Sequence, residues 1–272
     1  MKGERVAIAP LDVFERTMSA LEAGLLVRDI ATFEISTCDC EEPAESVFSR
    51  PEIEGYDFVP VRNEARVVGV LERPACLQGK SAAACMRALD DSVLVSAEEP
   101  LKRFLPLLCD AEYRLVVRGT SIEGIVTRGD VHKLPVRLLA FALVTHLETT
   151  MADVIARQSP DDAWLGLLSP ARRQKVEEKL AVLRARHLDP PLVELTEFAD
   201  KRDLLAKQGH LGRGKERERA TRNLRDVEDL RNVVAHAATY AQSEPGLREF
   251  LRVLDLTERH IGALCSISWP ET

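Results

Sequence analysis

An arginine, an asparagine and a histidine stand close together near the C-terminus, at Arg231, Asn232 and His236. The segment around them, residues 226–240, repeats apolar residues at helical spacing, which predicts an amphipathic helix. Asn232 and His236 are four residues apart and share one face of such a helix. Arg231 and His236 are separated by roughly 140° of helical rotation, so Arg231 must curl round to His236 or meet the His236 of another chain. An imidazole can move a proton near neutral pH, and a guanidinium can stabilise developing negative charge.

The hexad from Arg231 to His236 resembles the signature of the HEPN superfamily, all-helical domains of which many are metal-independent ribonucleases. The resemblance implies that His236 acts as general base or general acid, that Arg231 stabilises charge on the phosphate, and that Asn232 orients one of them. It further implies a homodimer whose cleft cleaves single-stranded RNA without a metal or other cofactor. The spacing alone also fits an ordinary capped helix with a satisfied histidine, and this alternative stays open.

A second group of chemically capable residues is Thr127, Arg128 and Asp130, within residues 124–130 (GIVTRGD). A hydroxyl and a carboxylate at a strand-to-helix turn can accept hydrogen bonds from ribose hydroxyls. The stretch is similar to the cystathionine-β-synthase (CBS) motif, in which the threonine and aspartate hold the ribose of an adenine nucleotide. The resemblance implies a regulatory ligand: AMP, ADP, ATP or a related adenosine compound, with Arg128 as a phosphate contact. The alternative is a helix N-cap, which the same residue types supply.

The elements that must position Thr127–Asp130 form an internal repeat of roughly 60 residues. Short β-rich runs at residues 58–61 and 67–71 return at 115–117 and 122–126, each pair joined by a polar turn. A further strand is expected at 93–95 and a helix at 100–108. The first copy reads GVLERP at residues 69–74, with neither the threonine nor the aspartate, so one intact nucleotide site is expected rather than two.

The elements that must position Arg231 are helices. After a first helix at residues 11–24, helices are expected at 138–155, from Ser159, from Ser169 to about His187, at 192–208, and at 247–264. Short loops joining four or five such helices make a bundle, and the HEPN resemblance extends over roughly residues 135–268. The predicted fold class is α+β: a CBS-domain pair at residues 1–134, followed by an all-α, HEPN-like bundle at 135–272.

Composition limits the possible partners and surroundings of the chain. It has 272 residues, 45% hydrophobic and 30% charged, as soluble globular proteins do. The net charge of −7 argues against non-specific coating of nucleic acid, although residues 201–231 are locally basic. No uninterrupted apolar run long enough to cross a bilayer and no signal-peptide core is evident, which predicts a cytoplasmic protein without membrane contact. The six cysteines are scattered, and no spacing of ligands predicts a metal site.

Two functions from different classes fit these observations. The first is a nucleotide-regulated, metal-independent endoribonuclease with its catalytic residues at a homodimer cleft. The second is a non-catalytic CBS sensor whose helical part binds RNA or docks a protein. The complete hexad favours the enzyme, because a scaffold has no need of an arginine, an asparagine and a histidine at this spacing. The negative net charge slightly favours the sensor.

Overall fold

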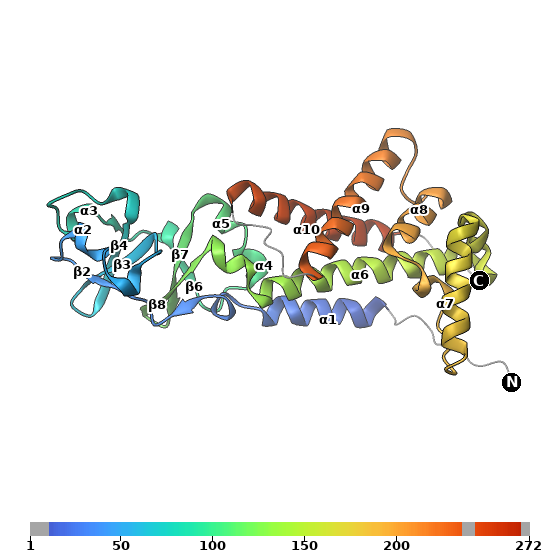
Figure 1. Cartoon of the computed structure of the whole chain (residues 1–272), viewed down its shortest axis with the longest axis horizontal. Helices are drawn as coiled ribbons and strands as arrows, with labels where there is room; N and C mark the ends of the chain where they lie inside the picture. Colours follow the sequence, from blue (N-terminus) through green and yellow to red (C-terminus); the bar gives the residue numbers. More distant parts are fainter. Residues whose placement is uncertain (1–10, 236–242, 268–272) are drawn as a thin grey trace. The chain divides into compact units, whose positions relative to one another are not determined.

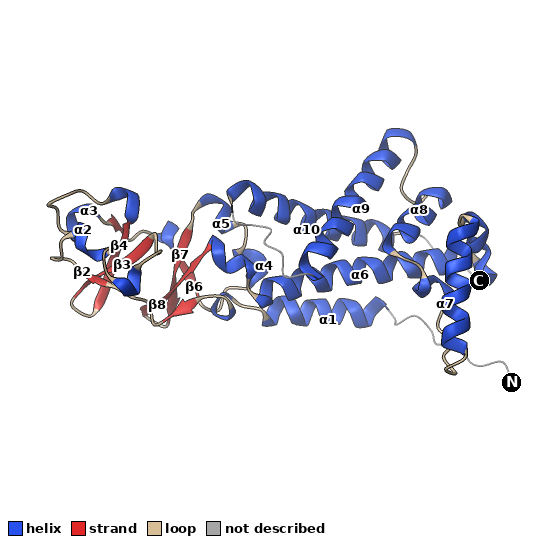
Figure 2. Cartoon of the chain, viewed as in Figure 1, coloured by secondary structure: helices blue, strands red, loops and turns tan. Residues whose placement is uncertain are grey.

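The computed structural model describes residues 11–235 and 243–267. These residues divide into two compact units. One, built from residues 22–136 and 243–248, holds every strand of the described chain; we call it the sheet unit. The other, built from residues 11–21, 137–235 and 249–267, contains only helices and loops; we call it the helical unit (Figures 1 and 2). The predicted α+β fold class is confirmed.

The sheet unit contains two four-stranded sheets with the same internal arrangement. In each, a short strand pairs parallel with the first of two long strands, the long strands form an antiparallel hairpin, and another short strand closes the far edge. The first sheet has the order β2 (Cys38–Asp39), β3 (Phe58–Asn63), β4 (Arg66–Glu72), β5 (Arg87–Ala88). The second has the order β6 (Leu94–Ser96), β7 (Tyr113–Arg118), β8 (Ser121–Thr127), β1 (Thr32–Phe33).

The two sheets correspond residue by residue. Each hairpin has a register shift next to the valine that faces a glycine: Val61 opposite Gly69, and Val116 opposite Gly124. A Cβ added at Gly69 would lie 2.6 Å from a carbonyl oxygen of the β5 segment, and one at Gly124 would lie 2.9 Å from a carbonyl oxygen of β1. Only glycine therefore lets the closing strand approach this closely. The internal repeat predicted from the sequence is a structural repeat, and its second copy is completed by β1, which precedes the first copy in the chain.

Short helices connect these strands and cover the sheets. They are η1 (Val27–Asp29), α2 (Ala44–Val47), η2 (Pro51–Ile53), η3 (Arg73–Ala75), α3 (Ala82–Cys85), η4 (Asp91–Val93), α4 (Leu101–Phe104), α5 (Leu107–Asp110) and η5 (Arg128–His132). The helix predicted over residues 100–108 is two helices, α4 and α5, because Pro106 lacks the N–H that would continue the first one. Buried Val59, Val61 and Leu71 form the centre of the first sheet's core.

The helical unit is formed largely by longer helices. They are α1 (Leu11–Gly24), α6 (Leu134–Gln158), η6 (Pro160–Leu167), α7 (Pro170–Arg184), η7 (Leu192–Leu195), α8 (Phe198–Gln208), α9 (Gly214–Ala235) and α10 (Glu244–Cys265). In the described chain from Leu134 onward there are helices and loops but no strand, which agrees with the helices predicted for this part.

Two predicted helices differ from the structure. The helix expected over residues 192–208 is interrupted at Glu197, whose extended backbone starts α8 as its N-cap. The Glu197 amide donates to Asp200 Oδ2 at 3.0 Å, so a local capping interaction replaces helical continuity. The helix expected from Ser159 is the 3-10 helix η6, in which Asp161 and Asp162 both have a φ of 57°. Helix α7 begins as predicted, with the Ser169 hydroxyl accepting from the Arg172 amide.

Helix α6 contributes more buried apolar residues than any other helix of the described chain. Among the described helices it is long and apolar enough to cross a membrane by length and composition, and 67% of its apolar window is buried inside the structure. A core helix of a globular unit meets the same criteria, so this finding is weak evidence for a membrane span. The sequence prediction concerned only uninterrupted apolar runs. It therefore did not single out α6, in which Arg137 and Glu148 interrupt the apolar residues.

Candidate functional site

The turn that follows β8 brings Thr127 and Asp130 into direct contact. The Thr127 amide and hydroxyl donate to Asp130 Oδ2 at 2.6 and 3.0 Å. Lys133 Nζ lies 2.7 Å from the other carboxylate oxygen, and Asp130 is only 8% exposed. The two residues predicted to hold ribose therefore also cap η5, so the capping alternative is part of the structure. Their oxygens keep lone pairs that could accept from a ligand.

This turn lines a cavity of about 490 Å³ within the sheet unit, a size within the usual range of small-molecule sites. Apolar side chains from both repeats contribute to its wall, among them Phe58 and Ile125. The complete lining is Thr32, Glu34, Ile35, Ser36, Gly55, Tyr56, Asp57, Phe58, Pro60, Glu112, Ile125, Thr127, Arg128, Gly129 and Asp130. The sequence identifies the turn of Thr127 to Asp130 as a site, but it does not identify the lining residues in the loops before β2 and β3.

Arg128 also lines the cavity, but its guanidinium contacts the preceding helix α5. Nε donates to the Leu108 carbonyl at 2.9 Å, and Nη2 donates to the Cys109 carbonyl at 3.3 Å. Nη1 lies 3.3 Å from a carboxylate oxygen of Glu112. All three guanidinium nitrogens have protein partners, so the expected phosphate contact would require Arg128 to leave them.

The turn at residues 72–75 of the first repeat has the same arginine amide hydrogen bond as the turn at Thr127 to Asp130, but it lacks the threonine and the aspartate. The amide of Arg73 donates to the Asp57 carbonyl at 2.9 Å, and the amide of Arg128 donates to the Glu112 carbonyl at 3.2 Å. The carboxylate of Glu72, at the position of Thr127, accepts a hydrogen bond from the Tyr113 hydroxyl at 3.3 Å. Burial and then this carboxylate raise the pKa of Tyr113 to about 12.

In the helical unit, Arg231 and Asn232 lie on α9, and His236 lies outside the described residues. The Arg231 side chain is 43% exposed, and its Nε lies 3.4 Å from Glu148 Oε2 of α6. Asn232 is exposed. Two of the three predicted catalytic residues are therefore accessible neighbours on one helix, and the position of the third relative to them stays a prediction.

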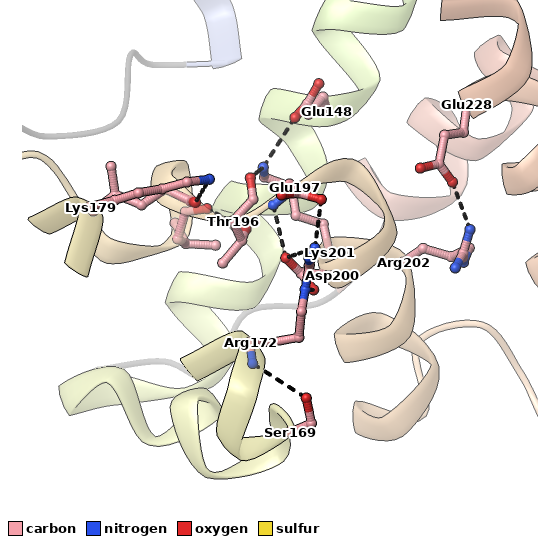
Figure 3. Close-up of polar contacts among 12 residues, drawn as sticks. Glu148, Ser169, Arg172, Lys179, Thr196, Glu197, Asp200, Lys201, Arg202 and Glu228 are labelled. Carbon is pink, nitrogen blue, oxygen red and sulfur yellow. Dashed lines mark hydrogen bonds and ion pairs between the residues drawn. The ribbon is translucent and has the colours of Figure 1, made fainter. Parts of the chain in front are cut away.

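Glu148 joins Arg231 to a buried lysine that the sequence analysis missed. Lys201 of α8 donates to Glu148 Oε1 at 3.1 Å and to the Thr196 carbonyl at 2.7 Å (Figure 3). The Lys201 side chain is 4% exposed, and burial lowers its pKa against the opposing effect of Glu148. One signal could have identified Glu148: it is one of two acidic residues in the otherwise apolar helix α6.

Other charged residues near this cluster are engaged in structural contacts. Glu228 of α9 accepts from Arg202 Nη1 at 2.8 Å. Arg172 of α7 contacts both Glu197 and Asp200 at 2.7 Å and so fixes the start of α8 (Figure 3). Within residues 11–235 and 243–267, no group of three or more histidine, cysteine or acidic side chains is placed to hold a metal ion.

Comparison with known proteins finds no matching family model and no matching curated protein. Several solved structures are similar. One is the CBS domain of a bacterial CNNM/CorC family Mg²⁺ transporter in complex with ATP, with 22% identity, 45% of this chain and 94% of that chain covered, and a TM-score of 0.35. Another is a CBS domain-containing protein of unknown function from Bacillus anthracis, with 16% identity, 43% and 96% covered, and a TM-score of 0.38.

A third similar structure is the CBS domain of a CBS domain-containing membrane protein from Sphaerobacter thermophilus, with 17% identity, 45% and 95% covered, and a TM-score of 0.38. All three are CBS domains, the family that the residues around Thr127 and Asp130 resemble. Identities this low concern the fold and do not indicate a shared ligand. The HEPN resemblance of the helical unit stays a prediction.

Proposed function

We propose that the sheet unit is a sensor that binds an adenine nucleoside or nucleotide in its cavity. The observation that carries this proposal is the Thr127–Asp130 turn at the wall of a 490 Å³ cavity. Ribose hydroxyls would donate to the carboxylate of Asp130, which its hydrogen bonds to Thr127 already orient. The apolar wall that includes Phe58 and Ile125 would receive the base.

Calorimetric titration with adenine nucleosides and nucleotides tests this sensor. Binding to the native state should also raise the Tm by mass action. Asp130→Asn keeps an oxygen for the Thr127 hydrogen bonds but removes the charge, and it should abolish or strongly weaken binding. Glu72→Gln changes the equivalent turn of the first repeat and serves as the matched control, with wild-type affinity. Absence of binding by every adenine compound would refute the sensor.

For the helical unit we propose metal-independent cleavage of single-stranded RNA by Arg231, Asn232 and His236 of a homodimer. His236 would act either as general base on a ribose 2′-hydroxyl or as general acid to the leaving 5′-oxygen. The 2′-oxygen attacks the adjacent phosphorus while the bond to the 5′-oxygen breaks, and the proton lost by the 2′-hydroxyl is balanced by one that the 5′-oxygen gains. The products are a 2′,3′-cyclic phosphate and a 5′-hydroxyl. Arg231 would stabilise the charge on the phosphate. The support from the structure is that Arg231 is partly exposed next to exposed Asn232, while Glu148 holds one edge of its guanidinium.

Cleavage of a single-stranded RNA in EDTA, with and without adenosine compounds, tests the enzyme. Arg231→Ala and His236→Ala should each reduce the rate by at least about 10²-fold, as expected when charge-stabilising or acid–base groups are lost. A 2′-deoxy substitution at the cleavage site should prevent the reaction. Should wild type leave every RNA intact, or should His236→Ala cut as fast as wild type, the alternative of a non-catalytic sensor with a binding module replaces the enzyme.

A further inference from the structure

The cavity of the sheet unit is lined by more acidic than basic side chains. Four acidic residues are part of its lining, Glu34, Asp57, Glu112 and Asp130, and Arg128 is the one basic residue of that lining. A phosphate-binding site usually offers arginine or lysine side chains with donors to spare. This lining instead has more acidic than basic residues.

The basic groups around the cavity are already paired with protein oxygens. Arg128 contacts two carbonyls of α5 and the carboxylate of Glu112. Lys133 Nζ lies 2.7 Å from Asp130 and donates to the Ile30 carbonyl at 2.6 Å. Each of these groups would have to give up existing partners before it could neutralise a ligand phosphate.

Arg73 of the first repeat is a third basic residue that is already paired with protein oxygens. Its Nη2 donates to the Tyr56 carbonyl at 2.7 Å, and its Nε lies 3.7 Å from the Asp57 carboxylate. It partly compensates the charge of Asp57, but it is not part of the cavity lining. Binding of a phosphorylated ligand would therefore have to recruit Arg73 from outside the wall.

Glu34 contributes a charge that no basic group offsets. It is exposed, has a φ of 58°, and makes no hydrogen bond or ion pair within the described part of the chain. A left-handed backbone is uncommon for a residue other than glycine. The acidic side chain at this position is thus held at the cavity by the backbone of the loop after β1, without help from a partner.

We infer that the cavity selects adenosine compounds whose 5′ substituent is uncharged or positively charged, and disfavours 5′-phosphates. The inference rests on the proposed sensor function and specifies its ligand class. Each phosphate adds negative charge to a partly enclosed site that is already acidic, and like charges at close range repel. A polyphosphate would enter well only when a divalent cation neutralises it, because the basic residues described around the cavity, Arg128, Lys133 and Arg73, are already paired with protein oxygens.

Calorimetry on the full chain tests this selectivity with adenosine, AMP, ADP and ATP, first in EDTA at low salt. The expected affinity falls from adenosine to ATP, by about tenfold or more for the first phosphate, as like-charge repulsion in a partly enclosed site predicts. The difference should shrink as salt rises, because mobile ions screen the repulsion. Magnesium should strengthen ATP binding and leave adenosine binding unchanged.

Glu34→Gln identifies the source of the selectivity. Glu34 has no partner to lose, so the variant should fold like wild type and narrow the gap between adenosine and AMP. Glu64→Gln is the matched control, since Glu64 is also an exposed glutamate with a positive φ of 54°, lies in the β3–β4 turn and does not line the cavity. It should leave the gap unchanged.

The outcomes separate the selectivity from the sensor itself. If ATP in EDTA binds as tightly as adenosine or more tightly, the charge selectivity is wrong and the adenine-nucleotide sensor stands. If adenosine and all three nucleotides fail to bind in EDTA and in magnesium, both are wrong. If the gap is present but Glu34→Gln and Glu64→Gln affect it equally, Glu34 is not its source and the inference is overturned at that residue.

Discussion

The chain turns through residues 72–75 after β4 and through residues 127–130 after β8, and the two turns share one backbone plan. Each places an arginine whose amide donates to the carbonyl of an acidic residue, Asp57 in one case and Glu112 in the other. The same arginine side chain contacts that acidic residue, at 3.7 and 3.3 Å. The residues around the arginine differ. The first turn has Glu72 and Ala75 where the second has Thr127 and Asp130.

This difference separates what the fold requires from what a ligand requires. The anchor between arginine and acid and the glycine beneath the closing strand occur in both repeats, since each sheet needs them to close. The hydroxyl and carboxylate pair occurs in one repeat, since only the second turn caps η5 in this way and lines the cavity. In the first repeat, the residue at the threonine position has a structural contact instead, between Glu72 and Tyr113.

The largest effect is expected from Asp130→Ala. The variant should lose adenosine binding by about 10- to 10²-fold, because hydrogen bonds to a charged group contribute roughly 1.5–3 kcal/mol. It should also lower the free energy of unfolding by about 1 kcal/mol, the usual cost of removing a cap. Titration calorimetry and urea unfolding measure the two effects. Ala75→Ser at the equivalent position should change neither, and loss of binding in that variant would break the comparison.

The next effect concerns the glycines that both repeats share. Gly69→Ala and Gly124→Ala should each destabilise the sheet unit by about 1–3 kcal/mol, the range for overpacking. Gly69→Ala should cost more, because its Cβ would lie 2.6 Å from both a backbone oxygen and the sulfur of Met86, whereas the closest approach at Gly124 is 2.9 Å. Urea unfolding followed by circular dichroism gives both values. Wild-type stability of both variants would contradict the close approach of the closing strands to these glycines.

A smaller difference is expected between the two arginine anchors. Arg128→Ala should lower the free energy of unfolding by about 1–2 kcal/mol, because it leaves two carbonyls of α5 without their donor. Arg73→Ala removes contacts to the Tyr56 carbonyl and to the ring of Phe48, at a more exposed site, and should cost less than about 1 kcal/mol. Thermal unfolding of both variants ranks them. The reverse order would show that the first repeat carries the stronger anchor.

The smallest effect is the pH dependence that comes from Tyr113. Its pKa is raised in the folded protein to about 12, by burial first and by Glu72 next, against an unfolded value of about 10. The neutral phenol therefore contributes stability that is fully present below pH 10 and is lost as the pH rises through 12. Tyr113→Phe should reduce the loss of Tm in this window, and it should leave the Tm near neutral pH free of any contribution from this titration. If the Tm of Tyr113→Phe fell with pH between 10 and 12 as steeply as the Tm of wild type, this contribution would be excluded.

Several secondary-structure elements could be predicted from the sequence, because residues close together in the chain specify them. Short β-rich runs joined by polar turns predicted the four long strands of the two hairpins, and Ser169 predicted the start of α7. The repeat also revealed which copy lacks the threonine and aspartate. These predictions succeed because hairpins and caps depend on residues a few positions apart.

Only the tertiary structure decided features that join distant parts of the chain. It showed that β1 completes the second sheet, that Arg128 contacts α5 rather than open solvent, and that Glu148 lies between Lys201 and Arg231. It also placed Glu34 in the wall of the cavity beside the turn of Asp130. No local pattern contains these contacts, because they depend on how separated segments pack, and packing brings together side chains that are remote in sequence.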